Sequence, residues 1–67
     1  MNVPKLLDTL IDRFKLKNDA ALSRASGLSP AVICKLRHGK LPLSAHSILS
    51  IHEHMNVPVK EIRQLAA

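Results

Sequence analysis

Apolar residues near the start of the chain recur with the spacing of one face of a helix. They stand at i, i+3, i+4, i+7, i+8 and i+11, at Val3, Leu6, Leu7, Leu10, Ile11 and Phe14. Pro4 suits the first turn, where the backbone N–H that proline lacks would have no partner inside the helix. The pattern predicts an amphipathic helix that buries one side.

A second helix of about two turns is predicted to follow. Asn18 and Asp19 are capping residues that favour its start. The residues expected to face inward are Ala21, Leu22 and Ala25. Gly27 predicts its end, because a left-handed residue after a helix is least costly as glycine.

A third helix is predicted to begin almost at once. Ser29 supplies a capping hydroxyl, and Pro30 has a fixed φ that suits the first helical position. We expect this helix to run to about His38 and to end at Gly39.

The rest of the chain predicts a loop at residues 40–43 and two more helices. Ser44 is expected to cap the fourth helix, Asn56 to end it, and Pro58 to start a short fifth helix. The residues expected inside are Ala45, Ile48, Leu49, Ile51 and Met55 in the fourth helix, and Val59, Ile62 and Leu65 in the fifth. No segment alternates with period two for long enough to form a strand, so we predict an all-α single domain over residues 1–67.

Composition and charge narrow the class of partner. The chain has 67 residues and a net charge of +5, and one Phe is its only aromatic residue, which nearly excludes stacking on unpaired bases. Between Arg13 and His52 the only acidic residue is Asp19. The basic residues of this stretch are Arg13, Lys15, Lys17, Arg24, Lys35, Arg37 and Lys40. Such a field attracts polyanions, most commonly nucleic acid, although a generic solvated surface is the alternative.

Two helices joined by a tight turn that contains glycine form a helix-turn-helix unit. At about 100° per residue, Val32, Ile33 and Leu36 share one side of the third helix and can pack inward. The opposite side carries Ala31, Cys34, Lys35 and His38. These residues are small or basic, which suits a helix that enters a DNA major groove about 12 Å wide.

The stretch DAALSRASGLSPAVICKLRHGK, residues 19–40, resembles the helix-turn-helix of the lambda-repressor-like, Cro and cI type (XRE-like) family of bacterial and phage regulators. The matching positions are Leu22, Gly27, Leu28, Ile33, Leu36 and Gly39. The following LPLSAHSILSIHEHMNVPVKEIRQL resembles the fourth and fifth helices of that family, so the likeness covers about residues 4–66. It implies a compact five-helix lambda-repressor-like domain. Such a domain would bind specific double-stranded DNA sequences as a small cytoplasmic transcriptional regulator or repressor, with residues 29–38 as its recognition helix.

The sequence departs from the family pattern at five positions. Pro30 and Ala31 occupy slots that often carry base-reading Gln or Ser, and Cys34 replaces a frequent Ser or Asn. Asp19 stands where relatives often have a Gln that touches phosphate, and Ser23 where Ala is usual. These changes bear on base preference rather than on the fold.

The resemblance and the helix geometry together imply roles for individual residues. Lys35 is expected to contact a base edge, guanine O6 or N7, and Ala31 a thymine methyl group. Cys34 is expected to lie against a base or to fill the groove. The expected contacts to the DNA backbone are Lys17, Asn18, Arg24, Ser29, Arg37, His38 and Lys40. The alternatives are a solvated lysine at position 35 and, at position 34, an exposed filler or a redox sensor.

A domain of this size has limited contact area, so DNA binding is expected to require a two-fold homodimer on a pseudo-palindromic site. The candidate dimer contacts are Val57, Val59, Ile62 and Leu65, which could equally belong to the core. The alternative function is a protein-interaction module, such as an antitoxin, that uses the same fold.

Other classes of function lack a sequence signal. His52 and His54 point about 200° apart on a helix, and His46 and His54 are two turns apart, so no shared metal ion is expected. No Gly-rich phosphate loop, nucleophile–base pair or carboxylate cluster indicates an enzyme, a cofactor or a small-molecule substrate. Cys34 has no partner for an internal disulfide, which fits a reducing cytoplasm. No apolar run of about 18 residues predicts a membrane span.

Overall fold

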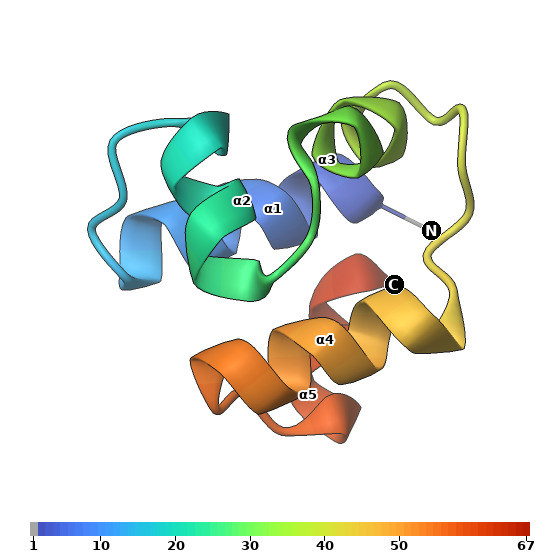
Figure 1. The fold of residues 1–67 in the computed structure, drawn as a ribbon. Helices are drawn as coiled ribbons and strands as arrows, with labels where there is room; N and C mark the ends of the chain where they lie inside the picture. The colour runs from blue at the N-terminus through green and yellow to red at the C-terminus, as the bar shows by residue number, and fades with distance from the viewer. Residues whose placement is uncertain (1) are drawn as a thin grey trace.

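Five α-helices follow one another along residues 2–67, the part of the chain that the computed structural model describes (Figure 1). They are α1 (Val3–Arg13), α2 (Asp19–Ser26), α3 (Pro30–Arg37), α4 (Ala45–Met55) and α5 (Val59–Ala66). Over these residues no strand occurs, which confirms the all-α prediction. The molecule measures 25 × 24 × 18 Å along its principal axes.

Most helix boundaries are set by the capping residues that the sequence predicts. The side chains of Asn18, Ser29 and Ser44 each accept a hydrogen bond from the backbone N–H three residues further on. Gly27 and Asn56 end α2 and α4 in the left-handed conformation, with φ of 76° and 55°. Local capping chemistry therefore accounts for these boundaries.

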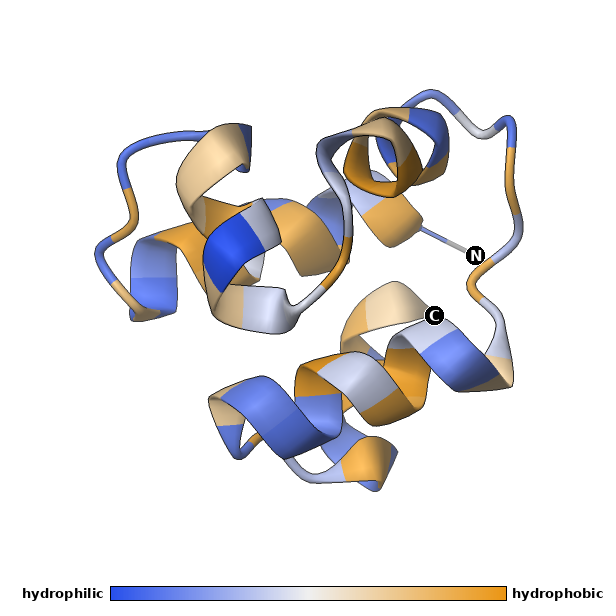
Figure 2. Ribbon diagram, viewed as in Figure 1, coloured by the Kyte–Doolittle hydropathy of each residue, from blue (hydrophilic) through white to orange (hydrophobic). Residues whose placement is uncertain are grey.

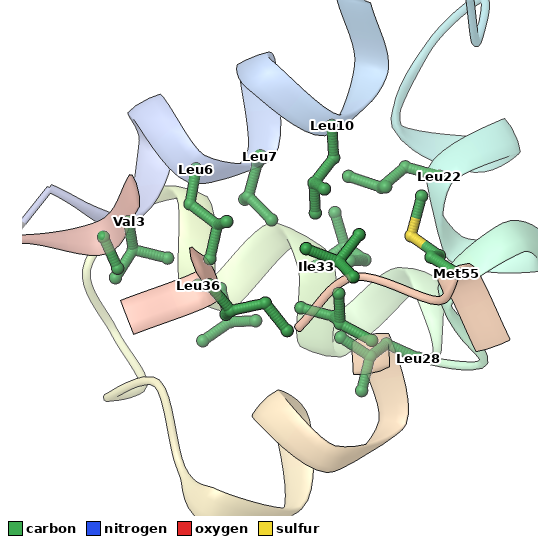
Figure 3. Close-up of a cluster of buried hydrophobic side chains, with 13 residues drawn as sticks. Val3, Leu6, Leu7, Leu10, Leu22, Leu28, Ile33, Leu36 and Met55 are labelled. Atoms are coloured by element: carbon green, nitrogen blue, oxygen red, sulfur yellow. The ribbon is translucent and has the colours of Figure 1, made fainter. Parts of the chain in front are cut away.

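The apolar side of α1 forms the centre of the core. Leu6, Leu7 and Leu10 are fully buried, and Figure 3 shows them pointing from α1 toward side chains of the other helices. Helix α1 packs against α2, α3 and α5. In Figure 2 the ribbon is hydrophobic on the sides of α1, α3 and α4 that face the interior. Phe14 departs from the predicted pattern, because it lies just past the end of α1 and is 39% exposed.

The fourth helix is rotated relative to the prediction. Ala45 and Leu49, both expected inside, are exposed, whereas Ser47 and Ser50 are buried. The apolar residues of α4 are spread around the helix, so their spacing does not select one inner side. The close contact between α2 and α4 is formed by small hydroxyl side chains, which leaves Leu49 on the outer side.

The fifth helix closes the core beneath α4 and against α1. Val57, in the turn before α5, is 2% exposed and Ile62 is fully buried, so two of the four predicted dimer contacts belong to the core. Val59 and Leu65 are half-buried. Arg13 at the end of α1 forms an ion pair with Glu61 of α5.

Candidate nucleic-acid interface

The third helix presents the outward side that its sequence predicts. Ile33 and Leu36 are each 1% exposed and anchor α3 in the core. The four residues of the opposite side, Ala31, Cys34, Lys35 and His38, are all exposed. No residue of α3 is acidic, so this outward side combines short side chains with positive charge.

Ser29 and Pro30 fix the point at which α3 begins. The backbone of Ser29 is extended, with φ −69° and ψ 156°, and its Oγ accepts a hydrogen bond from the N–H of Val32 at 3.2 Å. Within residues 2–67 the Ser29 hydroxyl donates no hydrogen bond, so its hydrogen is available to an anion. At the other end, Gly39 adopts a φ of 72° and turns the chain away from α3.

Gly27 lies where α2, the turn and α4 come closest together. Its φ of 76° is in the left-handed region, where a Cβ is unfavourable. A Cβ at this position would also lie 2.6 Å from Cε1 of His54 on α4. The His54 ring is itself held by a contact of 2.9 Å between its Nδ1 and the carbonyl oxygen of Ser50. The backbone conformation therefore favours glycine here, and any larger residue would also have to displace the His54 ring.

Buried serines add hydrogen bonds at the same place. The Oγ of Ser50 on α4 donates to the carbonyl oxygen of Ser26, the last residue of α2, at 2.8 Å. The Oγ of Ser23 donates to the carbonyl oxygen of Leu28 in the turn, and the N–H of Leu28 donates to Oγ of Ser26 at 3.3 Å. Every buried side-chain nitrogen or oxygen atom among the described residues has a hydrogen-bond partner.

We refer to Ser23, Ser26, Gly27, Ser50 and His54 as the joint. The joint fixes α2 against both the turn and α4, and so fixes one end of the turn from which α3 leaves. Sequence reasoning identified Gly27 and the tolerated hydroxyl of Ser23, but it missed Ser26 and Ser50. The available signal was that both are small polar residues in helices whose inner sides are otherwise apolar.

Arg37 lies along the surface toward α1 and α2, where it is paired with two carboxylates. Its Nε and Nη2 donate to the two carboxylate oxygens of Asp19, each at 2.8 Å, and its Nη1 donates to Oδ1 of Asp8 at 2.9 Å. The hydrogen bonds with Asp19 raise the pKa of Arg37 above its ordinary value. The predicted phosphate contact finds no support in this arrangement, because the guanidinium already has two carboxylate partners and is 24% exposed. Arg37 instead connects α3 to α1 and α2.

These ion pairs make the charge on the two flanks of α3 unequal. On the flank of Arg37, two carboxylates surround one guanidinium. On the other flank lies Lys35, and the backbone N–H of Lys40 donates to its carbonyl oxygen at 2.8 Å. This basic flank adjoins a hollow between the starts of α3 and α4, lined by Gly27, Leu28, Ser29, Val32, Leu41, Pro42, Ser44, His46 and Ser47. Positive charge is therefore concentrated on one half of the outward side.

The remaining predicted phosphate contacts lie outside α3. Lys17, Arg24 and Lys40 are exposed, and none of them forms an ion pair within residues 2–67. Asn18 caps α2 with its Oδ1, which accepts from the N–H of Ala21 at 3.0 Å and leaves the amide NH₂ group exposed. Figure 1 places the start of α2 and the whole of α3 along one edge of the molecule, at the top of the view.

Cys34 and His38 form a local pair at the centre of the outward side. Nδ1 of His38 lies 2.8 Å from the carbonyl oxygen of Cys34 and 3.6 Å from its Sγ. A neutral His38 that donates through Nδ1 carries no hydrogen on Nε2, so only the imidazolium form can donate to a phosphate. Cys34 is a free, exposed cysteine.

No protein-family model, no curated protein and no solved structure matches the chain. No helix within residues 2–67 is both long and apolar enough to cross a bilayer. Over the same residues, no group of three or more His, Cys, Asp or Glu side chains is placed to hold a metal ion.

Proposed function

We propose that α2, the turn and α3 form a helix-turn-helix unit that binds specific sequences of double-stranded DNA, as a small Cro- or cI-like regulator does. The observation that carries the proposal is the outward side of α3, where four small or basic residues are exposed on a helix fixed by Ile33 and Leu36. An α-helix fits the major groove, which is about 12 Å wide. Short side chains at positions 31 and 34 allow the helix to approach the base edges closely.

Lys35 is the principal base-reading residue in this proposal. Its ammonium group donates to O6 or N7 of a guanine, a contact that contributes about 1–3 kcal/mol of discrimination when it is well paired. Ala31, in the first turn of α3, lies against a thymine methyl group. Cys34, between them on the same side, packs against the neighbouring base.

The DNA backbone is held on both sides of α3. Lys17, Arg24 and Lys40 supply positive charge, and the hydroxyl of Ser29 and the amide of Asn18 donate hydrogen bonds. His38 lies exposed at the end of α3, within reach of the same backbone. Arg37 is not part of this set, because Asp8 and Asp19 occupy its guanidinium. With about three cationic phosphate contacts per domain, the slope of log affinity against log salt concentration is expected to be about −3 per domain.

Selection of bound sequences from a random pool of duplex DNA tests this proposal. Fluorescence anisotropy on the selected site should then show that Lys35→Ala lowers affinity by about 1–3 kcal/mol and relaxes the preference at one base pair. Lys60→Ala, which removes an exposed lysine on α5, is the matched control and should leave the preference unchanged. Absence of binding to any duplex at low salt would contradict DNA binding, and unchanged specificity in the Lys35 variant would contradict this placement of α3.

A further inference from the structure

The outer side of α4 carries an exposed leucine beside an apolar hollow. Leu49 is 49% exposed, more than Phe14 (39%) or Leu41 (37%), the other exposed large hydrophobic residues of the described chain. On the helix it lies opposite the buried residues of α4. The hollow lies between α4 and α5 and is lined by Ala45, Ile48, Leu49, Val59 and Arg63. We call these five residues, together with Glu53, the α4–α5 face.

We propose that the α4–α5 face binds the same face of a second copy of this chain, forming a two-fold dimer. An interface of this symmetry requires a surface that is complementary to itself. The face meets this requirement, because a projecting Leu49 and a hollow lie side by side on it. A two-fold axis near Leu49 places the two leucines together at the centre, beside the hollow that each of them borders. The inference does not depend on DNA binding.

The charges on the face point to an antiparallel arrangement of the two α4 helices. Arg63 borders the hollow, and Glu53 lies one turn after Leu49 on the same side of α4. Neither forms an ion pair within residues 2–67. When two α4 helices cross antiparallel at Leu49, position 53 of one lies opposite position 45 of the other, since both are four residues from the centre. Because Ala45 and Arg63 line the same hollow, each Glu53 then meets the partner's Arg63.

The size of the face limits the area that the dimer can bury. A standard stable interface buries about 800 Å² per partner, which is close to one fifth of the 4237 Å² accessible surface of this chain. The α4–α5 face is one side of a body measuring 25 × 24 × 18 Å, so it provides at most about that area. We therefore expect a dissociation constant of about 10–100 µM in the absence of DNA.

This face replaces the dimer surface that the sequence predicts. Val57 and Ile62 are inaccessible in the core, and of the predicted set only Val59 lines the hollow. The sequence pattern predicted Leu49 inside the molecule, so it did not identify the residue on which the interface depends.

Sedimentation velocity without DNA, from about 10 µM to about 1 mM protein, tests the proposal. The wild-type chain should show a mass that rises with concentration, and Leu49→Glu should weaken association by about thirtyfold or more, as expected for a central interface residue. Leu41→Glu is the matched control, because Leu41 is also an exposed leucine but lies outside the face, and it should associate as the wild type does. A wild-type chain that stays monomeric at about 1 mM would overturn the proposal.

A charge exchange tests the antiparallel arrangement separately. Arg63→Glu should weaken association by about tenfold, because Glu53 then faces another carboxylate. The double variant Glu53→Arg, Arg63→Glu should regain wild-type association, since the exchanged pair is again complementary across the axis. Circular dichroism confirms that each variant is folded. Failure of the double variant to recover, or association of the Leu49→Glu variant at wild-type strength, would overturn the assignment of this face.

Discussion

Helix α2 is held on two sides by different kinds of interaction. Toward α1 the contact of α2 and α3 is mainly apolar, since Leu6, Leu7 and Leu10 are fully buried, and the ion pair of α3 with Asp8 lies at its edge. Toward α4 it is the joint, where Ser50 donates a hydrogen bond to α2 and His54 packs over Gly27. The first contact has many interchangeable atoms and little directional preference, whereas the second has few atoms and strict geometry.

The two contacts are therefore expected to affect different properties: the stability of the fold and the orientation of α3. Hydrophobic burial is proportional to area and tolerates small rotations, so α1 determines how firmly the chain is folded. Hydrogen bonds and a glycine contact fix angles, so the joint contributes to where the outward side of α3 points, together with the core contacts of Ile33 and Leu36. Loss of apolar contact should therefore reduce the folded fraction. Damage to the joint should reduce DNA affinity by more than the loss of folded protein explains.

The largest effect is expected for Leu7→Ala. Removing this fully buried side chain from α1 leaves a cavity and should lower the free energy of unfolding by about 3 kcal/mol. That is a large share of the roughly 3–10 kcal/mol expected for a chain of this length. Urea unfolding followed by circular dichroism measures it, with Leu41→Ala, at a half-exposed position, as the control. Equal losses for the two leucines would contradict the role of α1 as the apolar anchor.

An intermediate effect is expected for Gly27→Ala. The left-handed backbone costs alanine about 1 kcal/mol, and displacement of the His54 ring adds a comparable amount, for about 2 kcal/mol in total. Gly39→Ala is a close control, because Gly39 has a similar φ of 72° but a Cβ there meets no atom within 4 Å. It should lose only about 1 kcal/mol.

Combining Gly27→Ala with His54→Ala measures the contact between the two residues directly. With the ring removed, the added methyl group should cost no more than it does at Gly39. If Gly27→Ala and Gly39→Ala were equally destabilising in the wild-type background, the contact across the joint would be energetically unimportant.

The smallest effect on stability is expected for Ser50→Ala, at about 1 kcal/mol. The change removes the buried donor to the carbonyl oxygen of Ser26. Thr9→Ala removes a comparable hydroxyl, which donates to the carbonyl oxygen of Lys5 at 2.7 Å on the exposed side of α1, and should change stability little. Anisotropy with a selected DNA site should show weaker binding for the Ser50 variant alone. An equal effect of both variants on DNA affinity would argue against the joint as the element that directs α3.

The sequence predicted the helices well because their ends depend on local chemistry. A capping side chain bonds to an N–H three residues away, and a left-handed glycine needs no distant partner, so Asn18, Ser29 and Gly27 could be interpreted without the fold. The outward side of α3 was predicted for the same reason, because two residues, or about 200° around the helix, separate Ile33 from Lys35.

Features that depend on contacts between distant segments were missed. Arg37 was expected at a phosphate, but its partner Asp8 comes from α1, 29 positions earlier in the chain. The predicted orientation of α4 was wrong. Ser50 faces α2 and occupies an inner position that hydropathy alone assigns to Leu49. Local spacing carries no information about either arrangement.

The two ends of the described chain lie side by side, since the backbone N–H of Asn2 donates to the carbonyl oxygen of Ala66 (Figure 1). A short glycine-rich linker could therefore close the polypeptide into a ring, and the chain could be reopened within residues 39–43 without cutting a helix. Such a circularly permuted protein keeps the contacts between the helices and changes the order in which the helices are synthesised. If the ring is left closed, the unfolded state has less conformational entropy to lose on folding. The cyclic protein should therefore unfold at a higher temperature with the same contacts.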